Sequence, residues 1–181
     1  MLFKQQHFIL ALTQKQLCLY AVTSTSADQE IEKIAAYDCT AQTAPQALEK
    51  ILTKLATVPH SLRLLLADEY AYITNVSIPN KLSPKEERAV VQEAAEILIP
   101  EELATALWDY KITETDTHTA TATVLVPVVR VYQPLEEMIT QAGIILEAVE
   151  TTRLALERHE NPVIGMALKT DITGKDAVVL N

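Results

Sequence analysis

Hydrophobic and polar positions follow two different periods along this chain, and the changes of period mark its elements. Between residues 68 and 150 the pattern predicts the order strand, helix, strand, strand, helix, strand, with strands at 70–78, 106–113, 119–129 and 144–149 and helices at 84–98 and 134–142. The strand period is clearest from Thr119 to Val124, where threonine alternates with alanine or valine. This order predicts a split βαβ unit of the ferredoxin-like kind, with both helices on one face of its sheet.

Start and stop signals support both helices of this unit. Ser83-Pro84-Lys85-Glu86 places a hydroxyl at the N-cap, a proline at the first helical position and a carboxylate three residues after the cap, which is a capping box. Gln133-Pro134-Leu135-Glu136 repeats this design, and Gly143 follows where a left-handed C-terminal cap is expected. Each helix is therefore predicted to begin at its proline.

The residues before this unit predict three strands, a helix and a further strand. The strands are expected at 8–12, 17–22 and 31–37, the helix begins near Thr43, and residues 62–67 form an aliphatic run typical of a strand covered on both faces. This βββαβ order opens the actin-like and ribonuclease-H-like sheet. The predicted fold class is therefore α/β (α+β), with a partial actin-like sheet formed by residues 1–69 and 151–181 and an inserted ferredoxin-like βαββαβ subdomain at residues 70–150.

The C-terminal part gives weaker patterns. Residues 151–158 are predicted to form a helix and residues 162–168 a helical turn. The apolar residues 178–180 fit either an edge strand or a docking segment.

Composition narrows the classes of function. The net charge of -9 argues against a nucleic-acid ligand and against adhesion to an anionic membrane surface. The N-terminal residues lack the apolar core of a signal peptide, and the two unpaired cysteines favour a reducing cytoplasm. Cys18 and Cys39 have no metal-ligand partners at suitable spacing, which favours buried free thiols; a disulfide would require neighbouring strands.

Signals for enzymatic chemistry are missing from the sequence. Its 3 glycines cannot build a phosphate-binding loop, and the 4 histidines stand without a carboxylate or thiol at ligand spacing, so neither a cofactor nor a metal is expected. Trp108 and Tyr110 alternate with Leu107 and Asp109 on one predicted strand, where they fit either core packing or a peptide-contacting face.

Four stretches of the sequence carry a resemblance to a known family: residues 76–79 (VSIP), 93–100 (EAAEILIP), 108–110 (WDY) and 142–150 (AGIILEAVE). Together they resemble the PilM family of type IV pilus assembly proteins and the cytoplasmic part of the related GspL secretion proteins. The resemblance implies an actin-like fold with a small subdomain inserted in its first lobe. It also implies ATP bound between two lobes, and a groove beside the insertion for a short cytoplasmic peptide of a membrane-anchored partner.

Two departures from the family pattern argue that ATP binding is lost. In the first hairpin, Ala11 stands where the family has an acid, and Thr13-Gln14-Lys15 replaces a turn rich in glycine and serine. The chain also ends soon after Arg158, which leaves no room for a second lobe, and one wall of a cleft would not offset the cost of ordering a nucleotide.

The sequence therefore predicts a non-enzymatic scaffold for type IV pilus or type II secretion-type assembly. It would bind the cytoplasmic segment of a PilN-like inner-membrane protein and lie peripherally at that membrane. The groove is expected between the front sheet and the inserted unit, with four aromatic candidates chosen from strand position: Tyr70, Tyr72, Trp108 and Tyr110. The alternative is a divergent nucleotide-binding protein that completes its cleft by self-association.

Overall fold

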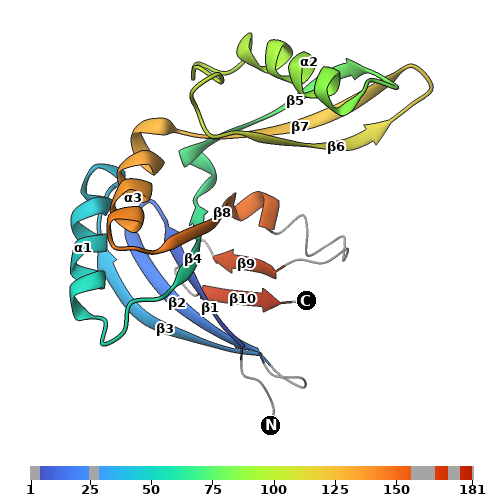
Figure 1. The fold of residues 1–181 in the computed structure, drawn as a ribbon. Coiled ribbons are helices and arrows are strands. Elements are labelled where there is room, and N and C mark those ends of the chain that lie inside the picture. The colour runs from blue at the N-terminus through green and yellow to red at the C-terminus, as the bar shows by residue number, and fades with distance from the viewer. Residues whose placement is uncertain (1–4, 25–28, 156–165, 171–175, 181) are drawn as a thin grey trace. The chain divides into compact units, whose positions relative to one another are not determined.

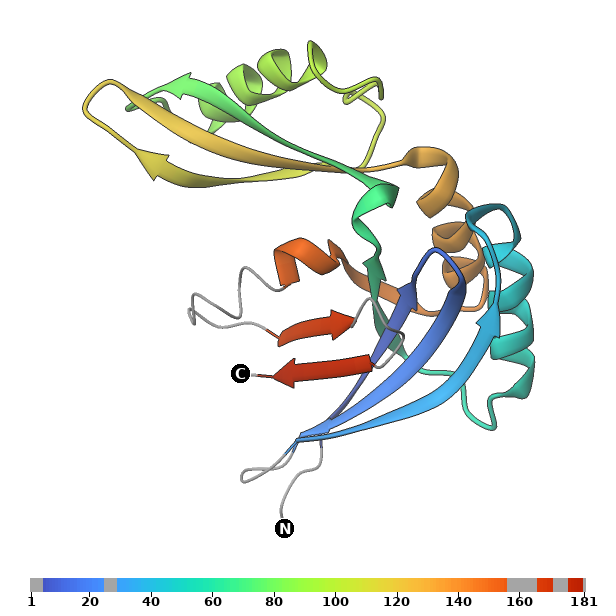
Figure 2. The same ribbon diagram turned by 180° about the vertical axis from the view of Figure 1, so that it is seen from behind.

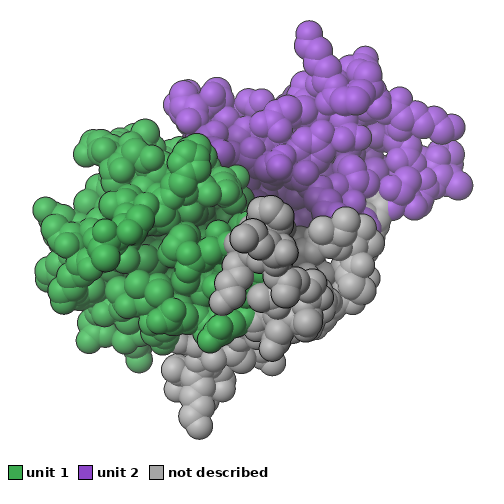
Figure 3. All heavy atoms as spheres, turned by 60° about the horizontal axis from the view of Figure 1, so that its bottom comes forward, with its two compact units in different colours: residues 1–68, 133–181 green, residues 69–132 purple. Residues whose placement is uncertain are grey.

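The computed structural model describes residues 5–24, 29–155, 166–170 and 176–180 (Figure 1). It is a mixed α/β structure, as the sequence predicts. The chain divides into two compact units: unit 1 comprises residues 1–68 and 133–181, and unit 2 comprises residues 69–132 (Figure 3). Each unit has its own sheet and is described separately.

Unit 1 contains a five-stranded sheet in the order β3-β2-β1-β4-β8. Neighbouring strands pair antiparallel among β1, β2 and β3, whereas β4 pairs parallel with β1 on one side and with β8 on the other. The predicted βββαβ opening is therefore confirmed. The five strands are β1 (Gln5–Leu12), β2 (Gln16–Ser24), β3 (Gln29–Asp38), β4 (Ser61–Leu66) and β8 (Ile145–Thr151).

Two helices lie side by side on one face of this sheet, α1 (Ala44–Lys54) and α3 (Val129–Gln141), as both ribbon views show (Figures 1 and 2). A 3-10 turn, η1 (Ala41–Thr43), leads into α1. The helices bury Leu48, Ile51, Leu135 and Ile139 completely, each at 0% exposure. The side chains of β1, β2 and β4 alternate between the two faces, so leucines from all three strands supply one of the two buried layers.

The alternate positions of the same strands form a second hydrophobic cluster. Ile9, Tyr20 and Leu65 belong to it, and Ala155 joins them from the helical turn at 152–155 that follows β8. The central strands of the sheet are therefore buried on both faces, which explains why β1, β2 and β4 have nearly continuous apolar sequences.

Unit 2 is a three-stranded antiparallel sheet in the order β5-β7-β6, covered on one face by helix α2. Val76, Ile78, Val91, Ala122 and Val124 lie in the core between helix and sheet. Its elements are η2 (Asp68–Tyr70), β5 (Ala71–Pro79), α2 (Pro84–Glu96), β6 (Asp109–Thr115) and β7 (Thr119–Pro127).

The predicted capping box at the start of α2 is confirmed. The Ser83 backbone N–H donates to Glu86 Oε2 at 2.9 Å, and the Glu86 N–H donates to Ser83 Oγ at 3.4 Å. The hydrogen bonds from Ser83 also lower the pKa of the exposed Glu86 carboxyl, because they stabilise its charged form.

The extent of the inserted unit differs from the prediction. The sequence placed the insertion at residues 70–150, whereas the compact unit ends at Tyr132 and β8 pairs with β4 in the five-stranded sheet. The insertion therefore has the order βαββ, and α3 and β8 belong mainly to unit 1. The physical reason is the burial of β4, in which Leu62, Leu64 and Leu66 are 2% exposed or less. A strand buried this deeply needs a neighbouring strand on each side to satisfy its backbone hydrogen bonds.

Helix α3 begins before the predicted start at Pro134. The N–H groups of Val131 and Tyr132 both donate to the carbonyl of Val128, so helical hydrogen bonding is established five residues upstream, from Val129. Pro134 lies inside the helix and removes one backbone donor. Val131 and Tyr132 are both buried, and their burial outweighs the start signal at the proline.

The C-terminal residues form a separate two-stranded sheet, in which β9 (Met166–Thr170) and β10 (Asp176–Leu180) pair antiparallel. The edge-strand prediction for residues 178–180 is confirmed. The helical turn predicted at 162–168 is wrong over residues 166–168, and residues 162–165 lie outside the described part of the chain, as does the end of the helix predicted at 151–158.

The predicted left-handed cap at Gly143 is confirmed, and it gives a test of the fold. Gly143 has φ +74°, its N–H donates to Thr140, and the Ile144 N–H donates to Ile139, which together form a Schellman motif. A Cβ at this position would meet nothing within 4 Å, so only backbone strain opposes a side chain.

We expect Gly143→Ala to lower the free energy of unfolding by about 1 kcal/mol in urea denaturation, because alanine resists positive φ. Gly143→Asn is the matched control and should lose less, since asparagine tolerates this conformation better. An alanine variant as stable as the unmodified protein would contradict the cap.

Candidate functional site

Three of the four aromatic candidates lie on the face of the unit 2 sheet that α2 covers. Tyr110 pairs with Val124 on β7, and Tyr72 pairs with Val126, so both share a face with these buried valines. Trp108, just before β6, belongs to the same hydrophobic core, against which Tyr72 and Tyr110 are partly buried. The structure therefore brings Tyr72, Trp108 and Tyr110 to one layer.

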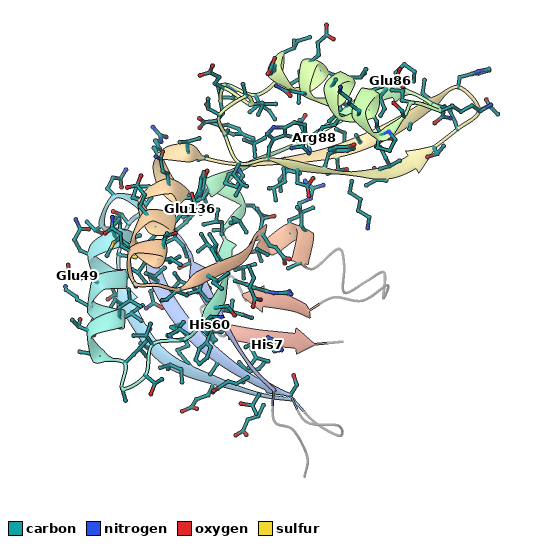
Figure 4. The ribbon with its side chains drawn as sticks, viewed as in Figure 1. His7, Glu49, His60, Glu86, Arg88 and Glu136 are labelled. Carbon is teal, nitrogen blue, oxygen red and sulfur yellow. The ribbon has the colours of Figure 1, made fainter. Side chains whose placement is uncertain are left out.

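Trp108 is the most enclosed of the candidates, at 8% exposure. Its ring stacks against Tyr110, with centroids 6.1 Å apart and an interplanar angle of 29°. The Arg88 guanidinium carbon lies 4.0 Å from the centroid of the Trp108 ring, and Arg88 extends from α2 toward the sheet in Figure 4. This stacked cation is a favourable contact for an indole. Trp108 is thus a packing residue, the first of the two interpretations that its sequence position allows.

Polar contacts connect the same helix to the same strand. The Tyr110 hydroxyl donates to Glu87 Oε1 at 2.8 Å. Partial burial and then the hydrogen bond to Glu87 raise the pKa of Tyr110, because both favour the neutral phenol. Arg88 also approaches Asp109 at 3.8 Å, but both side chains are exposed and such a pair contributes little. These side-chain contacts link α2 to β6 and to Trp108 just before it.

Tyr70 lies apart from this layer. It ends η2, is partly exposed, and its backbone carbonyl accepts the N–H of Val128 at 2.9 Å. That hydrogen bond joins the first and last segments of unit 2, where the chain enters and leaves it. Tyr70 therefore lies at the base of the unit, whereas the other three candidates lie under its helix.

The opposite face of the unit 2 sheet is polar and rich in threonine. Thr123 donates its hydroxyl to Asn75 Oδ1 at 2.8 Å and lies 3.3 Å, oxygen to oxygen, from Thr113. Asn75 and Ser77 on β5 are exposed on this face. Sequence reasoning predicted a polar face from the alternation of Thr119, Thr121 and Thr123, but it placed no candidate residue there.

In unit 1, the parallel strands β1, β4 and β8 all end on the same side of the sheet, which we call the carboxyl edge. This is the side where an actin-like sheet would face a nucleotide. The acids and hydroxyls at this edge support the backbone. Asp68 Oδ1 accepts the Arg153 N–H at 2.9 Å, and Thr151, which is 0% exposed, accepts the Leu154 N–H at 3.4 Å. Thr13 accepts the N–H groups of Lys15 and Gln16 within the β1–β2 turn.

Ala11, at the position where the family pattern has an acid, is buried at 3% exposure in the second cluster of unit 1. Its methyl group packs with apolar neighbours. The groups described at this edge therefore cap turns and a helical start.

The cysteines and metal-ligand types offer no further site within the described ranges. Cys18 and Cys39 are both buried and form no disulfide. Burial, and after it the nearby Cys18, raises the pKa of the Cys39 thiol, which keeps that thiol neutral. No three side chains of His, Cys, Asp or Glu gather as metal ligands in the residues that the structure describes. No helix in those ranges has the length and apolar character needed to cross a membrane.

Comparison with known proteins gives a likeness of fold. No family model matches the sequence, and no curated protein matches it significantly. The structure is similar to a chain of the PilM-PilN type IV pilus biogenesis complex, with a TM-score of 0.66 and 16% identity, over 86% of this chain and 50% of that one. This chain thus spans about half the length of that neighbour.

A second similar structure is the cytoplasmic domain of EpsL, an inner membrane component of the type II secretion system of Vibrio cholerae. The TM-score is 0.54 and the identity 18%, over 97% of this chain and 71% of that domain. The partial actin-like fold, and the resemblance to PilM and GspL proteins that the four sequence stretches indicate, are both confirmed at the level of fold.

The contact between Tyr110 and Glu87 gives a test of this cluster. Tyr110 is expected to ionise at higher pH than an ordinary tyrosine, so its contribution to stability is complete below pH about 10 and is lost as pH rises through its raised pKa. In Glu87→Gln the pKa of Tyr110 should fall only part of the way toward that of an ordinary tyrosine. Burial, the larger cause of the raised pKa, remains in this variant.

An absorbance titration of the tyrosines, with Tyr110→Phe to identify the contribution of this residue, measures the shift. Glu93→Gln is the matched control, since Glu93 is exposed on the same helix. Equal titrations of the Glu87→Gln and Glu93→Gln variants would show that the hydrogen bond is not formed.

Proposed function

We propose that this protein is a non-enzymatic scaffold in a type IV pilus or type II secretion-type assembly, where it binds the cytoplasmic segment of a PilN-like inner-membrane protein. The observation that carries the proposal is the fold shared with the two neighbours, one from a pilus complex and one from a secretion system. Binding to such a partner would hold the protein peripherally at the cytoplasmic side of the inner membrane.

The hydrogen bonds at the carboxyl edge of unit 1 support a binding role over nucleotide chemistry. A phosphate site needs backbone N–H groups or cations aimed at the ligand, and a metal site needs carboxylates directed outward. Here Asp68 and Thr151 accept backbone N–H groups, Thr13 accepts within its own turn, and Ala11 carries no ligand atom. No observation on the described residues favours the alternative of a nucleotide cleft completed by self-association.

The four aromatic candidates differ in how they can serve a partner. Trp108 is enclosed by Arg88 and Tyr110, and Tyr110 is hydrogen-bonded to Glu87, so these two residues hold the shape of unit 2. Tyr72 and Tyr70 are partly exposed, the first on an edge strand and the second at the base of the unit. We therefore assign the contacts with the partner segment to Tyr70 and Tyr72, because partly exposed tyrosines on a rigid support are effective anchors.

Fluorescence anisotropy with a labelled peptide tests this function. The peptide is the cytoplasmic segment of the PilN-like protein from the same genome, added to the full chain. The unmodified protein should bind it, and Tyr70→Ala and Tyr72→Ala should each weaken binding by about tenfold.

Tyr37→Ala is the control of matched residue type. Tyr37 is partly exposed on β3 of unit 1, beneath Lys50 and Lys54, and its loss should leave the affinity unchanged. Fluorescence of Trp108, the one tryptophan in the chain, reports whether unit 2 remains folded in each variant. Lack of binding by the unmodified protein would refute the function, whereas full binding by both tyrosine variants would refute only these anchors.

A further inference from the structure

The edge strands of the described sheets differ in charge. Edge positions belong to β3 and β8 in the five-stranded sheet, to β5 and β6 in the three-stranded sheet, and to both strands of the β9–β10 pair. Five of these strands carry charged side chains, such as Glu32, Glu147, Lys111, Lys169 and Asp176. The remaining one, β5, has the sequence AYITNVSIP and carries none. Charged residues on an edge strand discourage pairing with another chain, so β5 lacks this protection.

The edge strand β5 also differs from β3, β8 and β6, the other edge strands of the two larger sheets, in the regularity of its pairing. The pairings of β3, β8 and β6 each contain a register shift, at Leu19/Tyr20, Leu62/Arg63 and Ile112/Glu114. The pairing of β5 with β7 runs from Ala71↔Pro127 to Pro79↔Thr119 without a shift. A bulge twists an edge and interrupts further pairing. β5 is thus a regular, uncharged strand of 9 residues whose outer edge has no partner among the described strands.

The connectivity explains why this edge is left open. In the order β5-β7-β6, a further strand of unit 2 could join only at an edge, and the sequence predicted residues 144–149 for that place. Those residues instead form most of β8, which pairs with β4 in unit 1. The chain therefore supplies no fourth strand to unit 2 from its described residues.

The side-chain pattern of β5 is self-complementary about Asn75, its central residue. If two copies pair antiparallel with Asn75 opposite Asn75, Tyr72 lies opposite Ile78 and Thr74 opposite Val76, all on the face that α2 covers. Ile73 and Ser77 lie opposite each other on the polar face. Asn75 Oδ1 accepts from Thr123, so its amide N–H groups remain as donors across the axis. No like charges meet, and a two-fold axis closes the assembly as a dimer.

We propose that the outer edge of β5 is a dimerisation surface, at which two copies of this chain join their three-stranded sheets into one continuous sheet. The inference goes beyond the scaffold function and does not depend on it. It identifies the strand, the orientation and the central residue of the interface.

Sedimentation-velocity ultracentrifugation of the full chain over a range of concentrations tests the proposal. The unmodified protein should form dimers, and Asn75→Lys should raise the dimer dissociation constant by about tenfold or more, because it places two lysines opposite each other. Thr115→Lys is the matched control, an exposed threonine on the other edge strand of the same sheet, and should leave the constant unchanged.

Cysteine cross-linking tests the register directly. Residues directly opposite each other in an antiparallel pair have Cα atoms about 4.5–5.5 Å apart, which a disulfide can bridge. Asn75→Cys should therefore form a covalent dimer on mild oxidation, and Thr115→Cys should not. The native Cys18 and Cys39 are buried, at 3% and 9% exposure, and should not interfere.

Three results would overturn the proposal: a monomer at all concentrations, a dimer unaffected by Asn75→Lys, or equal cross-linking of the two cysteine variants. If circular dichroism shows that Asn75→Lys is misfolded, the exposed Ser77→Lys replaces it, since in the proposed pairing it places a charge opposite Ile73 of the second copy. A monomeric protein whose peptide binding is lost in Asn75→Lys would assign the edge to the partner segment, which refutes the dimer and leaves the scaffold function standing.

Discussion

The parallel pairing of β4 with β8 determines the path of the rest of the chain. The two strands are matched from Ser61↔Ile145 to Leu66↔Thr151. Neighbouring parallel strands cannot be joined by a tight turn, so the connection must leave the sheet and cross back. Here the crossover runs from residue 67 to residue 144 and contains both α3 and unit 2. Because β4 is buried between β1 and β8, this pairing ties both ends of the crossover to one hydrophobic core.

This connectivity gives unit 2 a defined base and a rigid interior. The Val128 N–H donates to the Tyr70 carbonyl where the two ends of the unit meet, and the capping box fixes the start of α2. Arg88 above Trp108 and Glu87 at the Tyr110 hydroxyl then link the helix to Trp108 and β6. A surface on such a support can bind a peptide without much loss of conformational entropy, which suits the proposed scaffold function. The role of the buried aromatic residues is to maintain that surface.

Local signals in the sequence were enough to predict most elements of the fold. Helix α2 was predicted from its capping box, the end of α3 from Gly143, and the front strands from their apolar runs. Pairing between distant strands was not predictable, because the apolar run of residues 144–149 fits an edge of either sheet. Only the packing around β4 decides between them. Similarly, the proline signal at Pro134 was outweighed by the burial of Val131 and Tyr132, which depends on the folded core.

The candidate site, too, was predictable from the sequence only in part. Strand alternation put Trp108 and Tyr110 on the same side of their strand, and the pairing of β5 and β6 with β7 brings Tyr72 to that face as well. Whether that face is open or covered depends on where α2 lies, which the sequence of β6 does not encode. The uncharged character of β5 was visible in the sequence. Its meaning appears only once the strand order shows β5 at an edge.

Isothermal titration calorimetry of the full chain with Mg·ATP tests the central claim most directly, at concentrations that would detect a dissociation constant of about 100 μM. The scaffold account predicts no heat of binding from a folded sample, because the groups at the carboxyl edge of β1, β4 and β8 serve the backbone. Heat that fits a single site would contradict this account of the carboxyl edge and show that the protein binds a nucleotide.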